Sequence, residues 1–107
     1  MTASADFPES RSARLIILGR VDNVGFEEFA MLYARRLSLS GRLTPSGGRL
    51  DIELYGRPEL IEMFEMACWL GPRRALVDSV TTSFEAPSNL YNDFSINSRL
   101  FFGSGTV

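Results

Sequence analysis

Hydrophobic residues in the first half of the chain change their spacing where a strand gives way to a helix. Residues 15–18 form a short, continuous apolar run that ends at Gly19, which predicts a central strand buried on both faces. After a break at residues 22–25, apolar residues recur every three or four positions up to Gly41, which predicts an amphipathic helix of about four turns. The apolar positions of this helix are Phe26, Phe29, Ala30, Tyr33, Ala34 and Leu37.

The middle of the chain continues with a hairpin and a second helix. Residues 46–48 supply a Ser-Gly-Gly turn, and the alternating apolar positions of residues 50–54 predict a strand with one buried face. Residues 42–44, before the turn, are too short to assign alone. Pro58 marks the first turn of a second helix that ends at Gly71 and Pro72. Its expected buried stripe consists of Leu60, Ile61, Phe64, Ala67, Cys68 and Leu70.

Two further strands complete the order of elements. Residues 77–84 are rich in β-branched side chains, and residues 90–96 alternate more weakly. Right-handed crossovers place both helices on one face of a mixed sheet. The sequence therefore predicts an α+β fold, a ferredoxin-like split β-α-β-β-α-β sandwich with an extra C-terminal strand. We expect the domain to span residues 13–97, between a disordered N-terminal tail (1–12) and a C-terminal tail (98–107).

Composition narrows the chemistry that one chain of this length can perform. The 107 residues suit a single domain, and a formal charge of −2 gives no positive field for nucleic acid, so no nucleic-acid partner is expected. Histidine is absent and Cys68 is the only cysteine. A Cys/His zinc site, a disulfide within the chain and a Ser-His-Asp triad are therefore excluded, and we expect no metal or cofactor. Cys68 is expected to be a buried, unreactive thiol.

The chain shows neither of two patterns that would direct it to a membrane. Residues 1–12 lack the apolar core of a signal peptide. No apolar run approaches the roughly 18 to 20 residues that a membrane-spanning helix needs. We expect a cytoplasmic protein with no membrane partner.

Three segments of the chain resemble the acylphosphatase family. Residues 19–27, Gly-Arg-Val-Asp-Asn-Val-Gly-Phe-Glu, are similar to the signature G-x-V-Q-G-V-G-F-R. Residues 41–43, Gly-Arg-Leu, look like the family's G-W-V segment, and residues 71–80 are similar to its G-P-x-x-A-x-V-x-x-V segment. The resemblance covers residues 14–96 and implies the same fold as the hydrophobic pattern.

The resemblance also implies a catalytic mechanism. Family members hydrolyse acyl phosphates without a metal or a covalent intermediate. Backbone amides and a helix dipole hold the phosphate, an arginine clamps it, and an asparagine positions the attacking water. In this chain the arginine position holds Glu27 and the asparagine position holds Pro45. The residues that match the phosphate-binding loop are Asp22, Asn23, Val24, Gly25 and Phe26.

These two replacements argue against the family's activity. Two unit charges about 5 Å apart interact by roughly 3 kcal/mol at an effective dielectric near 20, so Glu27 would turn the attraction for phosphate into repulsion. A helix dipole contributes about 0.3 to 1 kcal/mol, at most about 2, and does not offset this. Pro45 offers no N–H and no polar side chain to hold water. Arg20 and Arg42 are the nearest basic residues in sequence that could compensate.

Two classes of function remain open. In the first class, the domain has lost acyl-phosphate hydrolysis and acts as a binding or interaction module. A small anion is then not expected as its ligand. A homodimer or a protein partner would then use an edge strand or the apolar tail residues Leu100, Phe101 and Phe102, which could instead pack on their own sheet. In the second class, the chain is an active hydrolase of acyl phosphates with rearranged residues.

Glu27 itself has two possible roles. It could stabilise the start of the helix or, if desolvated beside Asp22, act as a general acid or base.

Overall fold

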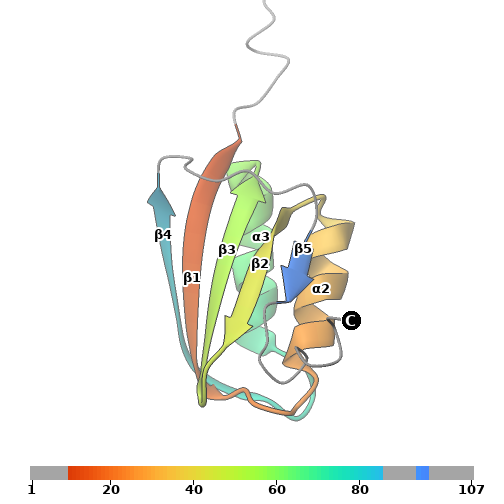
Figure 1. The fold of residues 1–107 in the computed structure, drawn as a ribbon, viewed down its shortest axis with the longest axis vertical. Coiled ribbons are helices and arrows are strands. Elements are labelled where there is room, and N and C mark those ends of the chain that lie inside the picture. Colours follow the sequence, from red (N-terminus) through yellow and green to blue (C-terminus); the bar gives the residue numbers. More distant parts are fainter. Residues whose placement is uncertain (1–9, 86–93, 97–107) are drawn as a thin grey trace, which may run out of the picture.

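The computed structural model describes residues 10–85 and 94–96 of the chain. In chain order the elements are β1 (Arg11–Arg20), α2 (Phe26–Arg36), β2 (Ser40–Pro45), β3 (Arg49–Gly56), α3 (Pro58–Leu70), β4 (Leu76–Glu85) and β5 (Phe94–Ile96). Figure 1 shows these elements as one layer of strands and one layer of helices. The predicted order of strands and helices is therefore confirmed.

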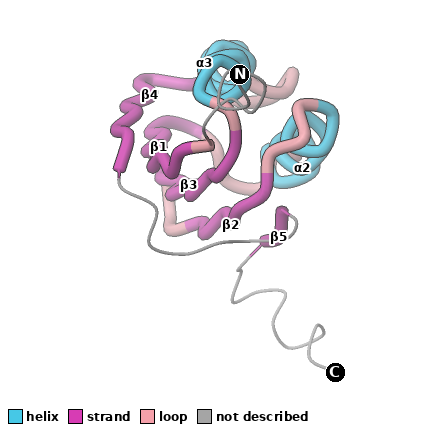
Figure 2. The backbone as a smooth tube through the Cα atoms, turned by 90° about the horizontal axis from the view of Figure 1, so that it is seen from above, coloured by secondary structure: helices cyan, strands magenta, loops and turns pink. Residues whose placement is uncertain are grey.

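The strands form a mixed five-stranded sheet in the order β4-β1-β3-β2-β5. All neighbouring pairs are antiparallel except β2 and β5, which are parallel. Seen from above, both helices lie on the same side of the sheet (Figure 2). This arrangement confirms the α+β ferredoxin-like fold with an extra C-terminal strand.

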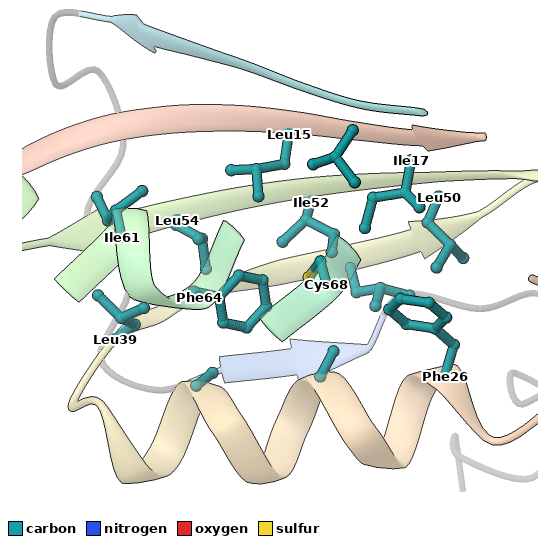
Figure 3. Close-up of a cluster of buried hydrophobic side chains, with 14 of the residues drawn as sticks. Leu15, Ile17, Phe26, Leu39, Leu50, Ile52, Leu54, Ile61, Phe64 and Cys68 are labelled. Carbon is teal, nitrogen blue, oxygen red and sulfur yellow. The ribbon is translucent and has the colours of Figure 1, made fainter. Parts of the chain in front are cut away.

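The hydrophobic core fills the space between the sheet and the two helices (Figure 3). Its largest fully buried side chains are Phe26, Phe64, Leu15, Ile17, Leu43, Leu50, Ile52, Leu54, Ile61 and Cys68. The prediction that residues 15–18 are buried on both faces is wrong, because Leu18 is 41% exposed. The strand does have a neighbour on each side, but both helices cover the same face of the sheet, so alternate residues of β1 lie on an open face.

Helix α2 is shorter than the four turns predicted, because its 11 residues end at Arg36. Ser38 adopts a left-handed conformation with φ of 57°. The amide of Ser38 donates to the carbonyl of Arg35, and the amide of Leu39 donates to the carbonyl of Ala34. This pair of hydrogen bonds is a Schellman motif, a common helix end that glycine usually provides.

Helix α3 buries a narrower stripe than predicted. Ile61, Phe64 and Cys68 are buried as expected, but Leu70 is 81% exposed, so its assignment to the stripe is wrong. Leu70 follows Cys68 by two residues, which rotates its side chain by about 200° around the helix. Burial raises the pKa of the Cys68 thiol, in keeping with the expected unreactive role.

Several predicted boundaries shift. β1 begins at Arg11, ahead of the apolar run at residues 15–18 from which the strand is predicted, and β2 includes the unassigned residues 42–44. Of the strand predicted over residues 90–96, the structure describes β5 at Phe94–Ile96. Residues 90–93 lie outside the described part of the chain, as do residues 1–9 and the tail with Leu100, Phe101 and Phe102. Among the residues with a described position, no helix has the length and apolar character required to span a bilayer.

The pairing of β1 with β4 contains one irregularity close to the loop that leads into α2. Leu18 pairs with Ser79 and Gly19 pairs with Val77, so Asp78 has no partner on β1. Gly19 has φ of 141°, and a Cβ at this position would collide with the carbonyl oxygen of Leu76. Glycine is therefore required at this position, because the backbone of β4 leaves no room for a side chain and the φ value is one that other residues rarely adopt.

Truncation of a residue in the centre of the sheet tests the described core. We expect Ile52→Ala to lower the free energy of unfolding by about 2 to 5 kcal/mol, because it removes buried methyl groups and leaves a cavity. Leu70→Ala is the matched control on an exposed position and should change stability by only about 0.5 kcal/mol. Urea unfolding of both variants measures the difference, and equal losses would contradict the assignment of the core.

Candidate functional site

The loop between β1 and α2 is held at both ends by buried side chains. Val21 follows the last residue of β1 and is buried, and Phe26 is the first residue of α2 and is buried as well. The ring of Phe26 also meets the ring of Phe29 edge-on, with 5.4 Å between their centroids. Residues 22–25 therefore form a largely exposed loop between two buried residues, Val21 and Phe26.

The backbone of this loop contains two residues in the left-handed region. Asn23 has φ of 53°, and Gly25 has φ of 85°, so both are left-handed. Asparagine and glycine are residues that tolerate this conformation. Gly25 precedes α2 as its N-cap, and no side chain caps the helix start. The loop thus retains the uncapped helix N-terminus and the left-handed turn that bind anions in many proteins.

Asp22 ties the loop to the turn between β2 and β3. Its Oδ2 atom accepts a hydrogen bond of 2.7 Å from the amide of Gly48. The amide of Gly19 donates to the carbonyl of Gly48 over 3.1 Å, which adds a second link between the same two segments. Two hydrogen bonds therefore hold the segment around Asp22 against the turn between β2 and β3.

The side chain of Glu27 carries a negative charge into the first turn of α2. It is half-buried, and its pKa is raised from the ordinary value of 4.5. Partial burial is the largest cause, followed by repulsion from Glu28 and from Asp22. Burial and the two neighbouring carboxylates therefore all disfavour the charged form of Glu27.

Pro45 is the last residue of β2 and lies directly before the turn that Asp22 contacts. It is partly exposed, and its Cα atom lies opposite that of Leu50 on β3. Because proline has no N–H and no polar side chain, the only polar group that Pro45 presents is its carbonyl oxygen.

The two basic residues considered as compensating groups lie on β1 and β2. Arg20 is exposed at the end of β1, opposite Leu76 of β4, and forms no ion pair with any residue that the structure describes. Arg42 lies opposite Glu53 in the sheet, and its Nη2 atom is 3.6 Å from Glu53 Oε1. Side chains at this register project from the open face of the sheet, whereas α2 covers the other face. The charge of Arg42 is thus directed towards Glu53.

The hydrogen bond between Asp22 and Gly48 could not be found by reading the sequence. The two residues are 26 positions apart, and neither belongs to a periodic pattern that relates them. Within residues 10–85 and 94–96, no group of three His, Cys, Asp or Glu side chains is placed to hold a metal ion. The arrangement that the structure does bring together is a left-handed turn surrounded by Asp22, Glu27 and Glu28.

Comparison with known proteins connects this chain to one family. The acylphosphatase family model matches residues 13–96. An acylphosphatase of Shewanella amazonensis is 32% identical over 87 residues, which cover 80% of this chain and 96% of the relative. An acylphosphatase of Roseiflexus is also 32% identical, over 78% of this chain and 91% of the relative.

Solved structures show the same likeness in three dimensions. The crystal structure of acylphosphatase from Bacillus subtilis superimposes with a TM-score of 0.77 and 26% sequence identity, covering 83% of this chain and 99% of the other. The similarity therefore extends over almost the whole length of these relatives.

Replacement of Asp22 tests the link between the loop and the turn. We expect Asp22→Ala to lower the free energy of unfolding by about 1 to 2 kcal/mol, because the Gly48 amide loses a charged acceptor. Asp22→Asn keeps an oxygen acceptor and should lose less. Thermal unfolding of the two variants provides the comparison, and an equal effect of both would show that this hydrogen bond does not hold the loop.

The raised pKa of Glu27 predicts a pH dependence of stability. A carboxyl group with a raised pKa in the folded state favours folding below its unfolded pKa, near 4.5, and loses this contribution as pH rises through the folded pKa. We therefore expect Glu27→Gln to become more stable relative to the natural chain as pH rises from about 4 to 7. Melting temperatures measured across this range give the trend.

Glu59 supplies a control with the opposite sign. Its pKa is lowered, chiefly by a hydrogen bond to its own backbone and then by Arg57, so Glu59→Gln should lose stability relative to the natural chain as pH rises. Parallel trends for the two variants would contradict the electrostatic description of Glu27.

Proposed function

Since the chain belongs to the acylphosphatase family, we propose that it is a member that has lost acyl-phosphate hydrolysis and acts as a binding or interaction module. The observation that carries this proposal is the half-buried carboxylate of Glu27, which occupies the position of the family's phosphate-clamping arginine. By the resemblance to the family signature, this carboxylate would face the substrate's phosphate in place of the arginine, and it has the same sign of charge as that phosphate.

The electrostatics of the loop support the loss of substrate binding. Asp22 and Glu28 both raise the pKa of Glu27, which indicates a negative potential around the turn. A phosphate group would add charge of the same sign to this potential, so its binding is disfavoured. The backbone turn persists, but its surroundings oppose the ligand for which the turn is shaped.

The position of the water-holding asparagine supports the same conclusion. Pro45 supplies neither a donor nor a side-chain acceptor. Arg42, the basic residue of β2, forms an ion pair with Glu53 on the open face of the sheet, away from α2. Its charge is therefore directed away from the start of α2. Neither the clamp nor the water site is restored by these residues.

An interaction role requires a surface other than the loop. The expected partners are a second copy or another protein, bound through an edge strand or through the tail with Leu100, Phe101 and Phe102. In the sheet as described, β4 is a ten-residue edge strand, which makes it the clearer candidate for strand addition.

An active hydrolase with rearranged residues remains the second candidate. It is favoured by the preserved left-handed turn at Asn23 and Gly25 and by the uncapped start of α2. In this alternative, exposed Arg20 is the basic residue available to the substrate. Phosphate would then protect the natural chain against unfolding.

A hydrolysis assay separates the two candidates. We expect the natural chain to hydrolyse benzoyl phosphate at the uncatalysed rate, with the Shewanella amazonensis acylphosphatase as a positive control. Inorganic phosphate should not change the melting temperature of the natural chain. In the double variant Glu27→Arg, Pro45→Asn, phosphate at ten times its Kd should stabilise the fold by about 1.4 kcal/mol, because the charge repulsion is removed while the turn remains.

Two results would contradict the proposal. Turnover of benzoyl phosphate well above the uncatalysed rate, abolished by Arg20→Ala, would establish the rearranged hydrolase. Stabilisation of the natural chain by phosphate would show that the turn still binds its ligand despite Glu27. Absence of phosphate binding by the double variant would instead show that the backbone of the loop is no longer competent.

A further inference from the structure

Helix α3 carries large apolar side chains on the side that faces away from the sheet. We define the outward face of α3 as Met63, Met66, Trp69 and Leu70, whose exposed fractions are 51%, 68%, 47% and 81%. Met63, Met66 and Leu70 follow one another at spacings of three and four, so they are neighbours on the helix surface. Trp69 adjoins Met66 at a spacing of three.

This exposure is unusual for a helix that already buries an apolar stripe. Ile61, Phe64 and Cys68 pack into the core between α3 and the sheet (Figure 3). A helix that is apolar on both sides is ordinarily covered on both sides, and clustered exposed apolar residues mark interaction sites. Methionine and tryptophan are suited to such contacts, because methionine adapts its shape and tryptophan buries a large area.

The charges of α3 indicate the chemistry of the partner. Glu59, Glu62 and Glu65 lie on the helix, and no basic residue lies between Pro58 and Leu70. Glu59 is paired with Arg57, whereas Glu62 and Glu65 form no ion pair within the described residues. Glu62 is a helix neighbour of Met66, and Glu65 is a helix neighbour of Trp69, each at a spacing of four.

We propose that the outward face of α3 binds a basic amphipathic helix of another protein. The apolar side of that helix would cover Met66 and its neighbours, and its positive residues would meet Glu62 and Glu65. A second copy of this chain would bring like charges together across the same face, which disfavours self-association there. The proposal concerns a surface distinct from the loop and does not depend on the loss of hydrolysis.

Trp69 provides an intrinsic probe of this surface, because it is the only tryptophan of the chain. The test titrates the full-length protein with a helical peptide of leucine and lysine that lacks tryptophan, and with a matched peptide of leucine and glutamate. We expect the basic peptide to shift Trp69 emission to the blue in a saturable manner. The affinity of this peptide should fall as salt is added, and the acidic peptide should leave the emission unchanged.

Variants of exposed residues locate the binding. Met66→Gln and Glu62→Lys should each weaken binding of the basic peptide by about tenfold. Leu32→Gln, at an exposed apolar position on α2, and Asp78→Lys, with the same change of net charge on β4, should leave binding of the basic peptide within about twofold.

Four outcomes would overturn the proposal. The first is no change in Trp69 emission with the basic peptide, and the second is equal binding of both peptides. The third is equal weakening by Glu62→Lys and Asp78→Lys, which would indicate only an effect of net charge. The fourth is that the outward face of α3 is already occupied in the absence of peptide. Occupation by a second copy would shift Trp69 emission to the blue as the protein concentration rises, and Met66→Gln would remove this shift. Occupation by the chain's own tail would give a red shift of Trp69 emission in the double variant Phe101→Ser, Phe102→Ser.

Discussion

The packing of both helices against one face of the sheet is the constraint on which the rest of the structure depends. It divides every strand into residues that fill the core and residues that face away from it, so Ile17 is fully buried while Leu18 is partly exposed. It also fixes where the chain must turn. β1 ends beside the start of α2, and the turn between β2 and β3 reaches the same end of the sheet, where Asp22 contacts Gly48.

The loop after β1 shows that backbone shape and side-chain chemistry can change independently. Its left-handed residues and buried anchors are held by packing and by the hydrogen bonds to Gly48, none of which involves the side chain of Glu27. A substitution at Glu27 therefore alters the charge of the site without removing what shapes it. Asp22 contributes in two ways, because it accepts a hydrogen bond from the turn and also raises the pKa of Glu27 by charge repulsion.

The sequence was sufficient for the types of element and for their order, because strand and helix periods differ clearly along this chain. It was insufficient where an end or a contact depends on three dimensions. Ser38 ends α2 through a conformation that serine rarely adopts, and the exposure of Leu70 reflects its rotation around α3. The assignment of Glu27 and Pro45 to the candidate site rests on motif resemblance, whereas the bond from Asp22 to Gly48 joins residues that no local pattern relates.

The unpaired Asp78 of β4 has a consequence for the behaviour of the protein at high concentration. Long, regular edge strands are templates for aggregation, because another chain can add to their free hydrogen-bonding groups. β4 has ten residues and lies at the edge of the described sheet, but its ladder is interrupted at Asp78, which also places a charge there. A bulge of this kind twists the edge, so the regular part of β4, residues 79–85, is compatible with one added partner strand, but the edge lacks the unbroken repeat that a growing fibril requires.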